Sequence, residues 1–382
     1  MAAIALNASL SVSSSRFSIQ GGRCRIAYRN RVRCAAGSSS QESEASASSS
    51  VVGLPEASIG IALAGGGEEQ QEVAPGEIGP GMEEIYSQCK VWEWKGLYKI
   101  NYVALVSSGG PAILLVHGFG ASIGHFRRNI PVLAKNYSVY AIDLLGLGAS
   151  EKPANFSYTM ETWGELLLDF IKDVMESAPT VLVGNSIGSL ACLTATANAT
   201  EGLIRGAVLL NCAGGMNNKA VVDDWRLKLA SPLLSLIDWL LKQPGISSRL
   251  FNRVKSRENL KTLLSSVYVN KEAVDQELIE IIRRPAEDPG ALEAFVSIIT
   301  GPPGPTPMAL IDKIHCPILV LWGDTDPFTP VDGPVGKYFT SLPSSRPNVK
   351  LRVLQNVGHC PHDDEPELVH EQLLPWLASL SS

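Results

Sequence analysis

Residues 184–188 read Gly-Asn-Ser-Ile-Gly, a Gly-x-Ser-x-Gly pattern centred on Ser186. In such a pattern a strand turns sharply into a helix, the serine lies at the apex, and the flanking glycines let the strand and helix approach each other. An apolar run, Val181-Leu-Val183, precedes the pattern, and a run of small residues from Ser189 to Ala199 follows it. This context favours a nucleophilic role for Ser186 over a glycine-rich turn with a solvated serine.

A serine hydroxyl is a weak nucleophile until an imidazole takes its proton, and the imidazolium then needs a buried carboxylate beside it. Two segments near the C-terminus supply these groups. The first carries Asp324 and Asp326 at the end of an apolar run, and the second carries His359 and His362 after the expected strand at 349–354. The order serine, aspartate, histidine is the one expected when the serine lies at such a strand-to-helix turn. The residue types alone do not decide between Asp324 and Asp326 as the acid, or between His359 and His362 as the base.

Other polar residues are less convincing candidates for catalysis. Asp143 precedes a glycine-rich turn and is expected to cap the local backbone. His117 begins the tight turn His117-Gly-Phe-Gly120, where backbone N–H groups are the functional atoms on offer. His125, His315 and His370 have no catalytic neighbours in the sequence.

The elements that would position these groups follow an α/β pattern. Residues 91–103 predict an antiparallel pair that turns at Gly96, and continuous apolar runs predict buried strands at 112–116, 137–142, 206–212 and 317–322. Helical spacing is present at 160–176 and ends before Pro179. Strands that alternate with helices predict a mostly parallel, doubly wound sheet.

This alternation lapses for about a hundred residues after the strand at 206–212. Amphipathic segments rich in Leu, Ile, Trp and Phe continue to residue 299, with breaks at Pro232, Pro244-Gly245 and Pro289-Gly290. We expect a helical cap at 216–315, inserted between a first part of the core at 81–215 and a second part at 316–382. Such an insertion would lie above the edge of the sheet that presents Ser186.

The N-terminal region has a different composition. Residues 1–34 contain six arginines, many serines and no acidic residue, which predicts an organelle transit peptide of plastid type. A mitochondrial signal and a disordered cytosolic tail are the alternatives. Residues 35–80, rich in Ser, Glu, Ala and Gly, predict a disordered linker.

Composition excludes several classes of function. The formal net charge is -6, and loss of the six N-terminal arginines would leave -12, so a nucleic-acid partner is not expected. The seven cysteines show no metal-ligand spacing, and no dinucleotide fingerprint or P-loop is present, so neither a metal nor a cofactor is expected. No apolar run reaches the roughly 18–20 residues of a membrane-spanning helix.

Four motifs in this order resemble the α/β-hydrolase superfamily over about residues 90–380: His117-Gly-Phe-Gly120, the serine pattern, Gly323-Asp-Thr-Asp326 and Gly358-His359. The resemblance implies that Asp326 is the acid and His359 the base. It also implies that the backbone N–H groups of Phe119 and Ile187 form the oxyanion hole. Haloalkane dehalogenases and epoxide hydrolases of this superfamily carry aspartate at the position of Ser186, so neither of these activities is expected.

Within the superfamily, the opening Val91-Trp-Glu-Trp-Lys95 and the loop from Gly358 to Pro366 resemble the pheophytinase and chlorophyll dephytylase group, and the shorter chain is closer to chlorophyll dephytylase. The resemblance implies a chloroplast esterase, peripheral to the thylakoid membrane, that removes phytol from chlorophyll or pheophytin. A plastid lipid esterase, a thioesterase, or a hydrolase-fold receptor with little turnover are the alternatives. An apolar cap is compatible with a long isoprenoid chain.

Overall fold

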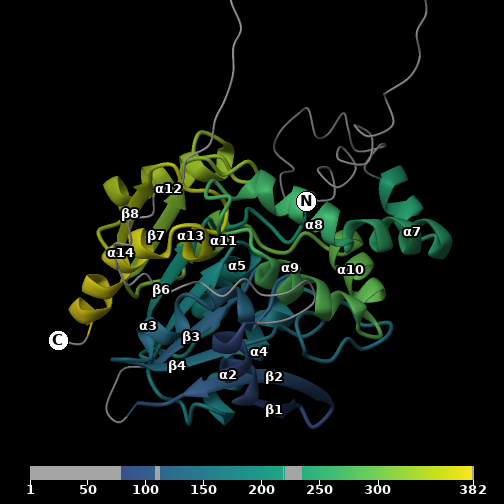
Figure 1. The fold of residues 1–382 in the computed structure, drawn as a ribbon. Coiled ribbons are helices and arrows are strands. Elements are labelled where there is room, and N and C mark those ends of the chain that lie inside the picture. The colour runs from purple at the N-terminus through teal and green to yellow at the C-terminus, as the bar shows by residue number, and fades with distance from the viewer. Residues whose placement is uncertain (1–78, 108–111, 218, 220–234, 381–382) are drawn as a thin grey trace, which may run out of the picture. The chain divides into compact units, whose positions relative to one another are not determined.

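The structure, a computed structural model, describes residues 79–107, 112–217, 219 and 235–380 (Figure 1). The expected transit peptide at 1–34 lies outside the described residues, as does the expected linker at 35–80 apart from its last two residues. Residues 218 and 220–234 of the expected cap also lie outside them. Among the described residues, no helix is long and apolar enough to cross a membrane.

Eight strands form one sheet in the order β1-β2-β4-β3-β5-β6-β7-β8. The pairs β1·β2 and β2·β4 are antiparallel and all other neighbours are parallel, which confirms the expected mostly parallel, doubly wound sheet. The strands are β1 (Cys89–Trp94), β2 (Tyr98–Leu105), β3 (Ala112–Val116), β4 (Ser138–Ile142), β5 (Thr180–Asn185), β6 (Ile204–Leu210), β7 (Ile318–Gly323) and β8 (Val349–Leu354).

The central strands are apolar along their whole length because helices cover both faces of the sheet. Every residue of β3, β5 and β7 is buried. Successive side chains of a strand point to opposite faces, so Leu114 and Val116 belong to one apolar cluster while Ile113 and Leu115 belong to another. Continuous apolar runs, with no polar alternation, are the sequence signature of this arrangement.

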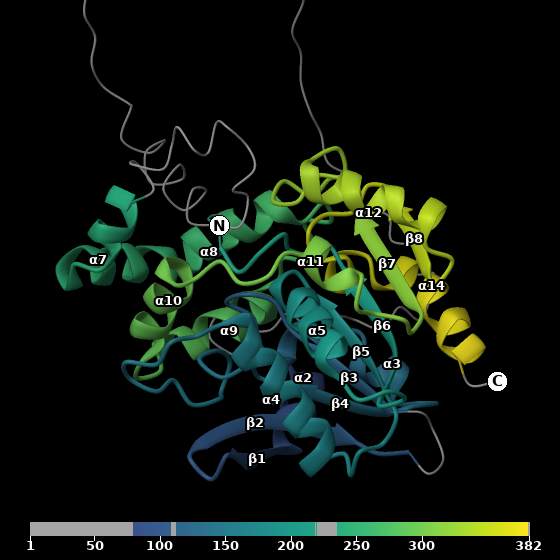
Figure 2. The same ribbon diagram turned by 180° about the vertical axis from the view of Figure 1, so that it is seen from behind.

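Each apolar cluster has its own helices (Figures 1 and 2). The first face is covered by α4 (Met160–Asp173), α5 (Ile187–Asn198), α11 (Pro307–Ile311) and α12 (Pro334–Ser345). The opposite face is covered by α2 (Pro80–Ser87), η1 (Ile123–Phe126), α3 (Ile130–Leu133) and α14 (Pro366–Leu380). Small residues let α4 and α5 pack closely, since a Cβ added at Gly164 would lie 2.8 Å from the Thr194 methyl group.

The segment between β6 and β7, which we call the cap, is helical over much of its described part. Its described elements, apart from α11, are α7 (Pro244–Val254), α8 (Arg257–Val267), α9 (Gln276–Arg283), η3 (Arg284–Glu287) and α10 (Ala291–Thr300). Three of these helices begin at residues that favour a helix N-terminus. Helix α7 has proline in its first turn, and the side chains of Ser256 and Asp275 cap α8 and α9. Figures 1 and 2 show these helices on one side of the sheet, with α7 farthest out.

Candidate active site

Ser186 lies at the junction of β5 and α5, with φ 55° and ψ −119°. This conformation is rare for a residue with a side chain and costs on the order of 1–3 kcal/mol, so the surrounding structure must impose it. A Cβ on Gly184 would lie 2.5 Å from the backbone of Gly188, and a Cβ on Gly188 would lie 2.4 Å from two carbonyl oxygens of the β3 end. Only glycine fits at both positions, as the serine pattern predicted.

Backbone contacts fix the serine from both sides. The Ser186 N–H donates to the Leu210 carbonyl at 2.9 Å, and the Ser186 carbonyl accepts from the Ala213 N–H at 3.1 Å. Ser189 in the first turn of α5 also donates its hydroxyl to the Gly184 carbonyl at 2.6 Å. The side chain is therefore held at the N-terminus of α5, where the helix dipole favours negative charge.

His359 and Asp326 lie against each other below the cap. The Nδ1 atom of His359 lies 2.7 Å from Oδ2 of Asp326, and both side chains are buried. The ionised carboxylate can only accept at this contact, so Nδ1 carries the proton and Nε2 is left as the proton acceptor of the ring. The structure therefore pairs the two residues that the resemblance assigned as acid and base.

The competing residues occupy other places. Asp324 accepts locally from the Thr325 hydroxyl and the Val357 N–H and makes no contact with His359 among the interactions of the described chain. His362 is buried in α13 (Pro361–Asp364), where its ring packs on Phe126 and His125. Neither alternative forms an acid–base pair in the described part of the chain.

The surroundings of Asp326 lower the pKa of its carboxyl group. Burial raises its pKa, but the charge of His359 and hydrogen bonds from His359, Thr329 and Asn211 more than offset burial and lower the pKa to about 2. The Asn211 amide lies 2.8 Å from Oδ2, and its oxygen accepts from the Gly323 N–H at 2.9 Å. Asn211 thus fixes the carboxylate relative to the end of β7.

The resemblance assigned the backbone N–H groups of Phe119 and Ile187 to an oxyanion hole. Phe119 follows β3 and contributes to the pocket beside Ser186, and Ile187 is the first residue of α5. Within the described chain neither N–H donates to a protein acceptor. Donors preorganised next to the nucleophile are the groups that stabilise the negative oxygen of a tetrahedral intermediate.

A pocket of about 160 Å³ lies over Ser186 and His359, between the core and the cap. The lining is almost entirely apolar. Its core residues include Phe119, Asn185 and Phe328, and the ring of Phe328 packs edge-on against His359 at 5.0 Å. The cap contributes the following residues: Phe251, Val254, Lys255, Leu260, Leu263, Leu264, Val267, Ile282, Ala286, Phe295 and Ile299.

The loop that carries His359 is held by the cap. The fully buried carboxylate of Asp364 accepts the N–H of Gly358 at 2.6 Å, and it accepts the N–H groups of Val269 and Asn270 in the cap at 3.1 and 2.8 Å. The His359 N–H itself donates to the carbonyl of Val267, the last residue of α8, at 2.9 Å. One buried carboxylate therefore joins the base loop to the helix that lines the pocket.

Gly358 permits this close docking. A Cβ at this position would lie 2.0 Å from the Val267 carbonyl oxygen, and real Cβ atoms essentially never come closer than 3.0 Å to such an atom. Any side chain here would push α8 away from the base loop.

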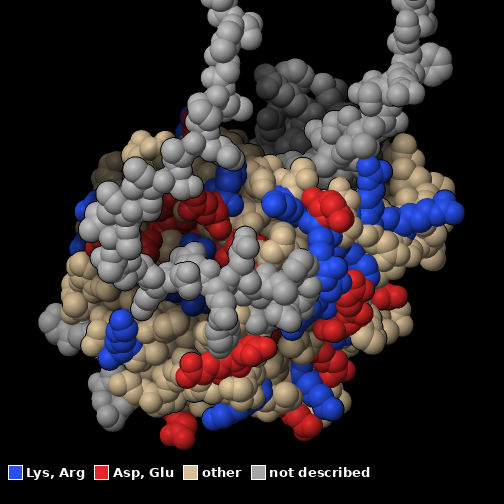
Figure 3. Space-filling model, in the orientation of Figure 1, with Lys and Arg blue, Asp and Glu red and all other residues tan. Residues whose placement is uncertain are grey.

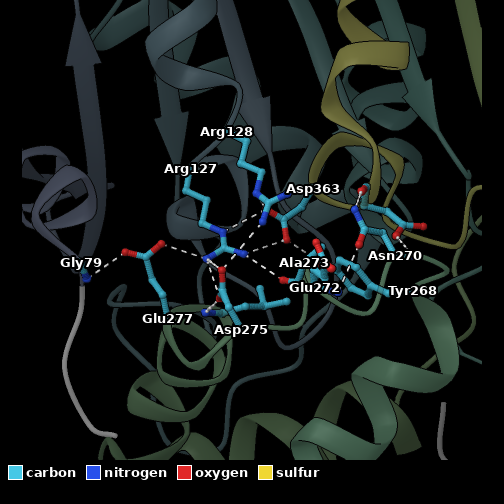
Figure 4. A network of polar contacts seen from close by, with 12 residues as sticks. Gly79, Arg127, Arg128, Tyr268, Asn270, Glu272, Ala273, Asp275, Glu277 and Asp363 are labelled. Atoms are coloured by element: carbon cyan, nitrogen blue, oxygen red, sulfur yellow. Dashed lines mark hydrogen bonds and ion pairs between the residues drawn. The ribbon is translucent and has the colours of Figure 1, made fainter. Parts of the chain in front are cut away.

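A second network ties the cap to the core beside this loop (Figure 4). Arg127, after η1, donates from Nε to Asp363 at 3.0 Å and from one terminal nitrogen to Asp275 and Glu277 at 2.8 and 2.9 Å. Its other terminal nitrogen donates to the Ala273 carbonyl at 3.0 Å. The guanidinium thus bridges the start of α9 to the residue next to Asp364, and each buried charge has a partner, as burial requires.

His125 joins the network from the pocket side. Its Nε2 lies 2.7 Å from the Tyr268 hydroxyl, which donates to Asp363 at 3.0 Å. Because that hydroxyl proton is directed to Asp363, His125 must donate from Nε2. Burial is the main cause that lowers the pKa of His125 to about 4, so the ring is neutral at pH 7.

Asp143 and His117, which the sequence predicted to have structural roles, make local contacts with the backbone. Asp143 accepts the N–H groups of Ile123 and Ala149 at 2.7 and 2.8 Å, as a local backbone cap does. His117 is fully buried, and its ring nitrogens contact Gly118 and Leu144 of neighbouring turns. Neither residue lines the pocket.

Sequence reasoning missed the supporting residues Asn211, Asp363, Asp364, Arg127 and His125. The two aspartates follow His359 within the same motif, which is the one local signal that pointed toward them. The other three come from distant segments and had no local signal. Within the described residues, no three His, Cys, Asp or Glu side chains are grouped as metal ligands.

Known proteins share this architecture. The family model described as the alpha/beta hydrolase family matches residues 113–372. An uncharacterized hydrolase of Bacillus subtilis, YugF, is 28% identical over 278 residues, which cover 73% of this chain and 94% of the relative. The chloroplast pheophytinase of Arabidopsis thaliana is 23% identical over 341 residues, which cover 78% of this chain and 67% of the relative.

The fold agrees with solved hydrolase structures. A serine hydrolase involved in carbazole degradation superposes with a TM-score of 0.58 at 23% identity, covering 76% of this chain and 98% of the other. The family model spans more than half of the chain, and the matched residues include Ser186, Asp326 and His359. The chain therefore belongs to the alpha/beta hydrolase family and is a hydrolase that resembles pheophytinase.

Proposed function

We propose that the chain is a serine carboxylic-ester hydrolase that cleaves the phytyl ester of chlorophyll or pheophytin. The products are phytol and the free acid, chlorophyllide or pheophorbide. One observation carries the proposal: the strained Ser186 and the Asp326-paired His359 line the same apolar pocket, between the core and the cap. The similarity to pheophytinase supports the choice of substrate.

The proposed reaction has two halves. In the first, Ser186 Oγ attacks the ester carbonyl carbon while Nε2 of His359 takes its proton, and the N–H groups of Phe119 and Ile187 bind the oxygen that becomes negative. The carbon–oxygen bond to phytol then breaks, and His359 returns the proton to the leaving oxygen. In the second half water attacks the acyl-enzyme by the same route and restores Ser186. Asp326 keeps the proton of His359 on Nδ1 throughout.

The pocket suits the alcohol part of such an ester. The aromatic ring of Phe295 lies between those of Phe119 and Phe251, with ring centroids 5.6 Å and 5.1 Å away. Each CH₂ group buried among such side chains contributes about 0.8 kcal/mol, so a long hydrocarbon chain gains far more from this pocket than a short one. No cofactor takes part in this reaction.

The test is direct product analysis. Purified protein is incubated with chlorophyll a and with pheophytin a in detergent micelles, and phytol and the free acids are separated and quantified. We expect equal amounts of phytol and free acid, and none with Ser186→Ala. Parallel incubations with a galactolipid and a long-chain acyl thioester identify a lipid esterase or thioesterase. Tight pigment binding without product would indicate a receptor and would contradict the proposal.

We also propose that the protein acts in the chloroplast, peripheral to the thylakoid membrane. The arginine-rich and acid-free residues 1–34 support a plastid address. A fluorescent protein fused to residues 1–80 should enter plastids. Uniform cytosolic or mitochondrial fluorescence would contradict this address.

A further inference from the structure

The outer part of the cap exposes three large apolar side chains. Leu236, Trp239 and Ile246 are 50%, 59% and 43% exposed. They lie in residues 235–254, a segment that we call the cap tip and that ends with α7. The core has similarly exposed apolar side chains only at Val91, Leu97 and Val106 among the described residues, around β1 and β2.

The cap tip is also basic. It carries Lys242, Arg249 and Arg253, and none of them forms an ion pair within the described part of the chain. The single acidic residue, Asp238, is paired with Lys219 at 2.5 Å. Figure 3 shows Lys and Arg side chains that project from the side of the molecule where α7 lies. The cap tip is therefore positive on a chain whose formal net charge is -6.

The two faces of α7 differ in a regular way. Ile246, Arg249 and Arg253 are spaced i, i+3 and i+7, which places them on one exposed face. Phe251 and Val254 are on the opposite face and line the pocket over Ser186. A single helix thus separates the pocket from the apolar and basic surface.

We propose that the cap tip docks on the surface of a lipid bilayer that carries anionic lipids. Trp239, Leu236 and Ile246 enter the boundary between headgroups and acyl chains, while the three cations contact the negative headgroups. A second copy of the chain fits this surface poorly, because a two-fold interface would bring the same positive side chains together. The docking deepens the proposed function, since it leaves only α7 between the pocket and the bilayer that holds a water-insoluble ester.

The test uses Trp239 as a reporter. Of the seven tryptophans, Trp94, Trp163, Trp322 and Trp376 are buried, Trp92 is only partly exposed, and Trp225 lies outside the described residues. The titrated protein therefore carries Trp225→Phe, so that a change at the surface is dominated by Trp239. Full-length protein is titrated with vesicles of neutral galactolipid containing 30% phosphatidylglycerol, and with vesicles of galactolipid alone. We expect a blue shift of the emission with the anionic vesicles, quenching by brominated lipid, and weaker binding as salt increases.

Two variants sharpen the test. Trp239→Ser, and the triple variant Lys242→Glu, Arg249→Glu and Arg253→Glu, should each reduce sedimentation with anionic vesicles at least tenfold. The matched control, Val91→Ser with Leu97→Ser, removes similarly exposed apolar side chains at the β1 edge of the sheet and should bind as the unmodified protein does. All variants should hydrolyse a short soluble ester at the unmodified rate, which also shows that they are folded.

Three results would overturn the proposal: no vesicle binding, equal binding by the variants and the unmodified protein, or a blue shift without vesicles that accompanies dimer formation. The outcome is separate from the test of the proposed function. Binding to vesicles without hydrolysis of phytyl esters would refute that function and leave the docking surface standing, and hydrolysis in micelles without vesicle binding would do the reverse.

Discussion

The two halves of the active site are held in place by different means. Ser186 is fixed by the sheet itself, through glycine contacts at both sides of the elbow and hydrogen bonds to Leu210 and Ala213. His359 lies on a loop that is held by buried carboxylates and by the cap, through Asp364 and the Val267 carbonyl. The position of the proposed nucleophile therefore depends on the core alone, whereas the position of the proposed base depends on contacts with the cap.

Because the cap holds the loop of His359, it has a second role besides covering the pocket. An insertion that only covered the pocket would affect long substrates and leave short ones alone. Here the segment after α8 also donates two backbone hydrogen bonds to Asp364. Hydrogen bonds to a charged group contribute about 1.5–3 kcal/mol each, which is enough to decide the position of a loop. We therefore expect removal of the whole cap to abolish activity on long and short esters alike.

The largest expected effect is at the core-held half. Ser186→Ala removes the nucleophile and should lower kcat on the order of 10⁶-fold, the scale found for the nucleophile of other triads. The variant with both Ser186→Ala and His359→Ala should be no slower, because the residues act as a unit. Steady-state hydrolysis of a short ester measures both. A single variant that kept a hundredth of the activity would show that another residue is the nucleophile.

The acid gives the next effect. Asp326→Asn should lower kcat about 10⁴-fold, because an amide in place of the carboxylate favours the wrong tautomer of His359. The matched control is Asp324→Asn, two residues earlier, which should change kcat only a few-fold because Asp324 contacts Thr325 and Val357 instead. The opposite ranking would show that the acid is misassigned.

The cap-held half is tested by Asp364→Asn. The substitution keeps the shape but places an NH₂ group against backbone N–H groups, so the base loop loses contacts with the cap. Misplacement of a catalytic group by about 1 Å can cost on the order of 10²-fold, so we expect kcat for a short ester to fall roughly 10–100-fold with KM nearly unchanged.

Three further measurements separate positioning from simple destabilisation of Asp364→Asn. The assay is run at a temperature where thermal unfolding shows the variant to be folded, and the pH profile of kcat should change in shape. Asp288→Asn, which removes an ion pair between the cap and Lys152 of the core at 2.8 Å, is the control and should leave kcat and the pH profile as they were. An unchanged kcat in folded Asp364→Asn would refute dependence of the base on the cap.

A smaller effect is expected inside the pocket. Phe251→Ala removes a ring that packs on Phe295 and should lower kcat/KM for a long-chain ester about tenfold, because the lost burial of about two CH₂ groups of the chain, at about 0.8 kcal/mol each, corresponds to roughly that factor. An acetate ester, which does not reach that far, should be hydrolysed within twofold of the unmodified rate. Equal losses on both esters would mean that α7 supports the catalytic loops and does not contact the substrate.

The smallest effect concerns stability at acid pH. The pKa of Asp326 is about 2 in the folded protein and about 3.8 in the unfolded chain, so the ionised form stabilises the folded state. That contribution, about 2 kcal/mol, is present above pH 4 and is lost as the pH falls toward 2. Urea unfolding between pH 5 and 2 should show a shallower fall for Asp326→Asn than for the unmodified protein. Identical pH dependence would argue against a carboxylate held in its charged form.

The same contrast explains what the sequence could predict. The elbow follows from local rules, since the glycines, the apolar strand and the small-residue helix are adjacent in the chain. The buried strands followed from apolar runs, and β1 and β2 meet at the expected turn near Gly96. The contacts that hold the loop of His359 could not be predicted from local sequence, because Asp364, Val269 and Val267 come together only when the cap docks on the core. Asn211 and Arg127 were missed for the same reason.

One measurement tests the central claim, that a core-held serine and a cap-held base act on long-chain esters, most directly. The protein is treated with alkyl phosphonate esters of increasing chain length, and the rate of covalent labelling is followed with mass spectrometry of the peptide that contains Ser186. We predict that the label is on Ser186, that labelling accelerates with chain length, and that Asp364→Asn slows labelling at every length. Labelling elsewhere, or a rate independent of both chain length and Asp364, would contradict the account.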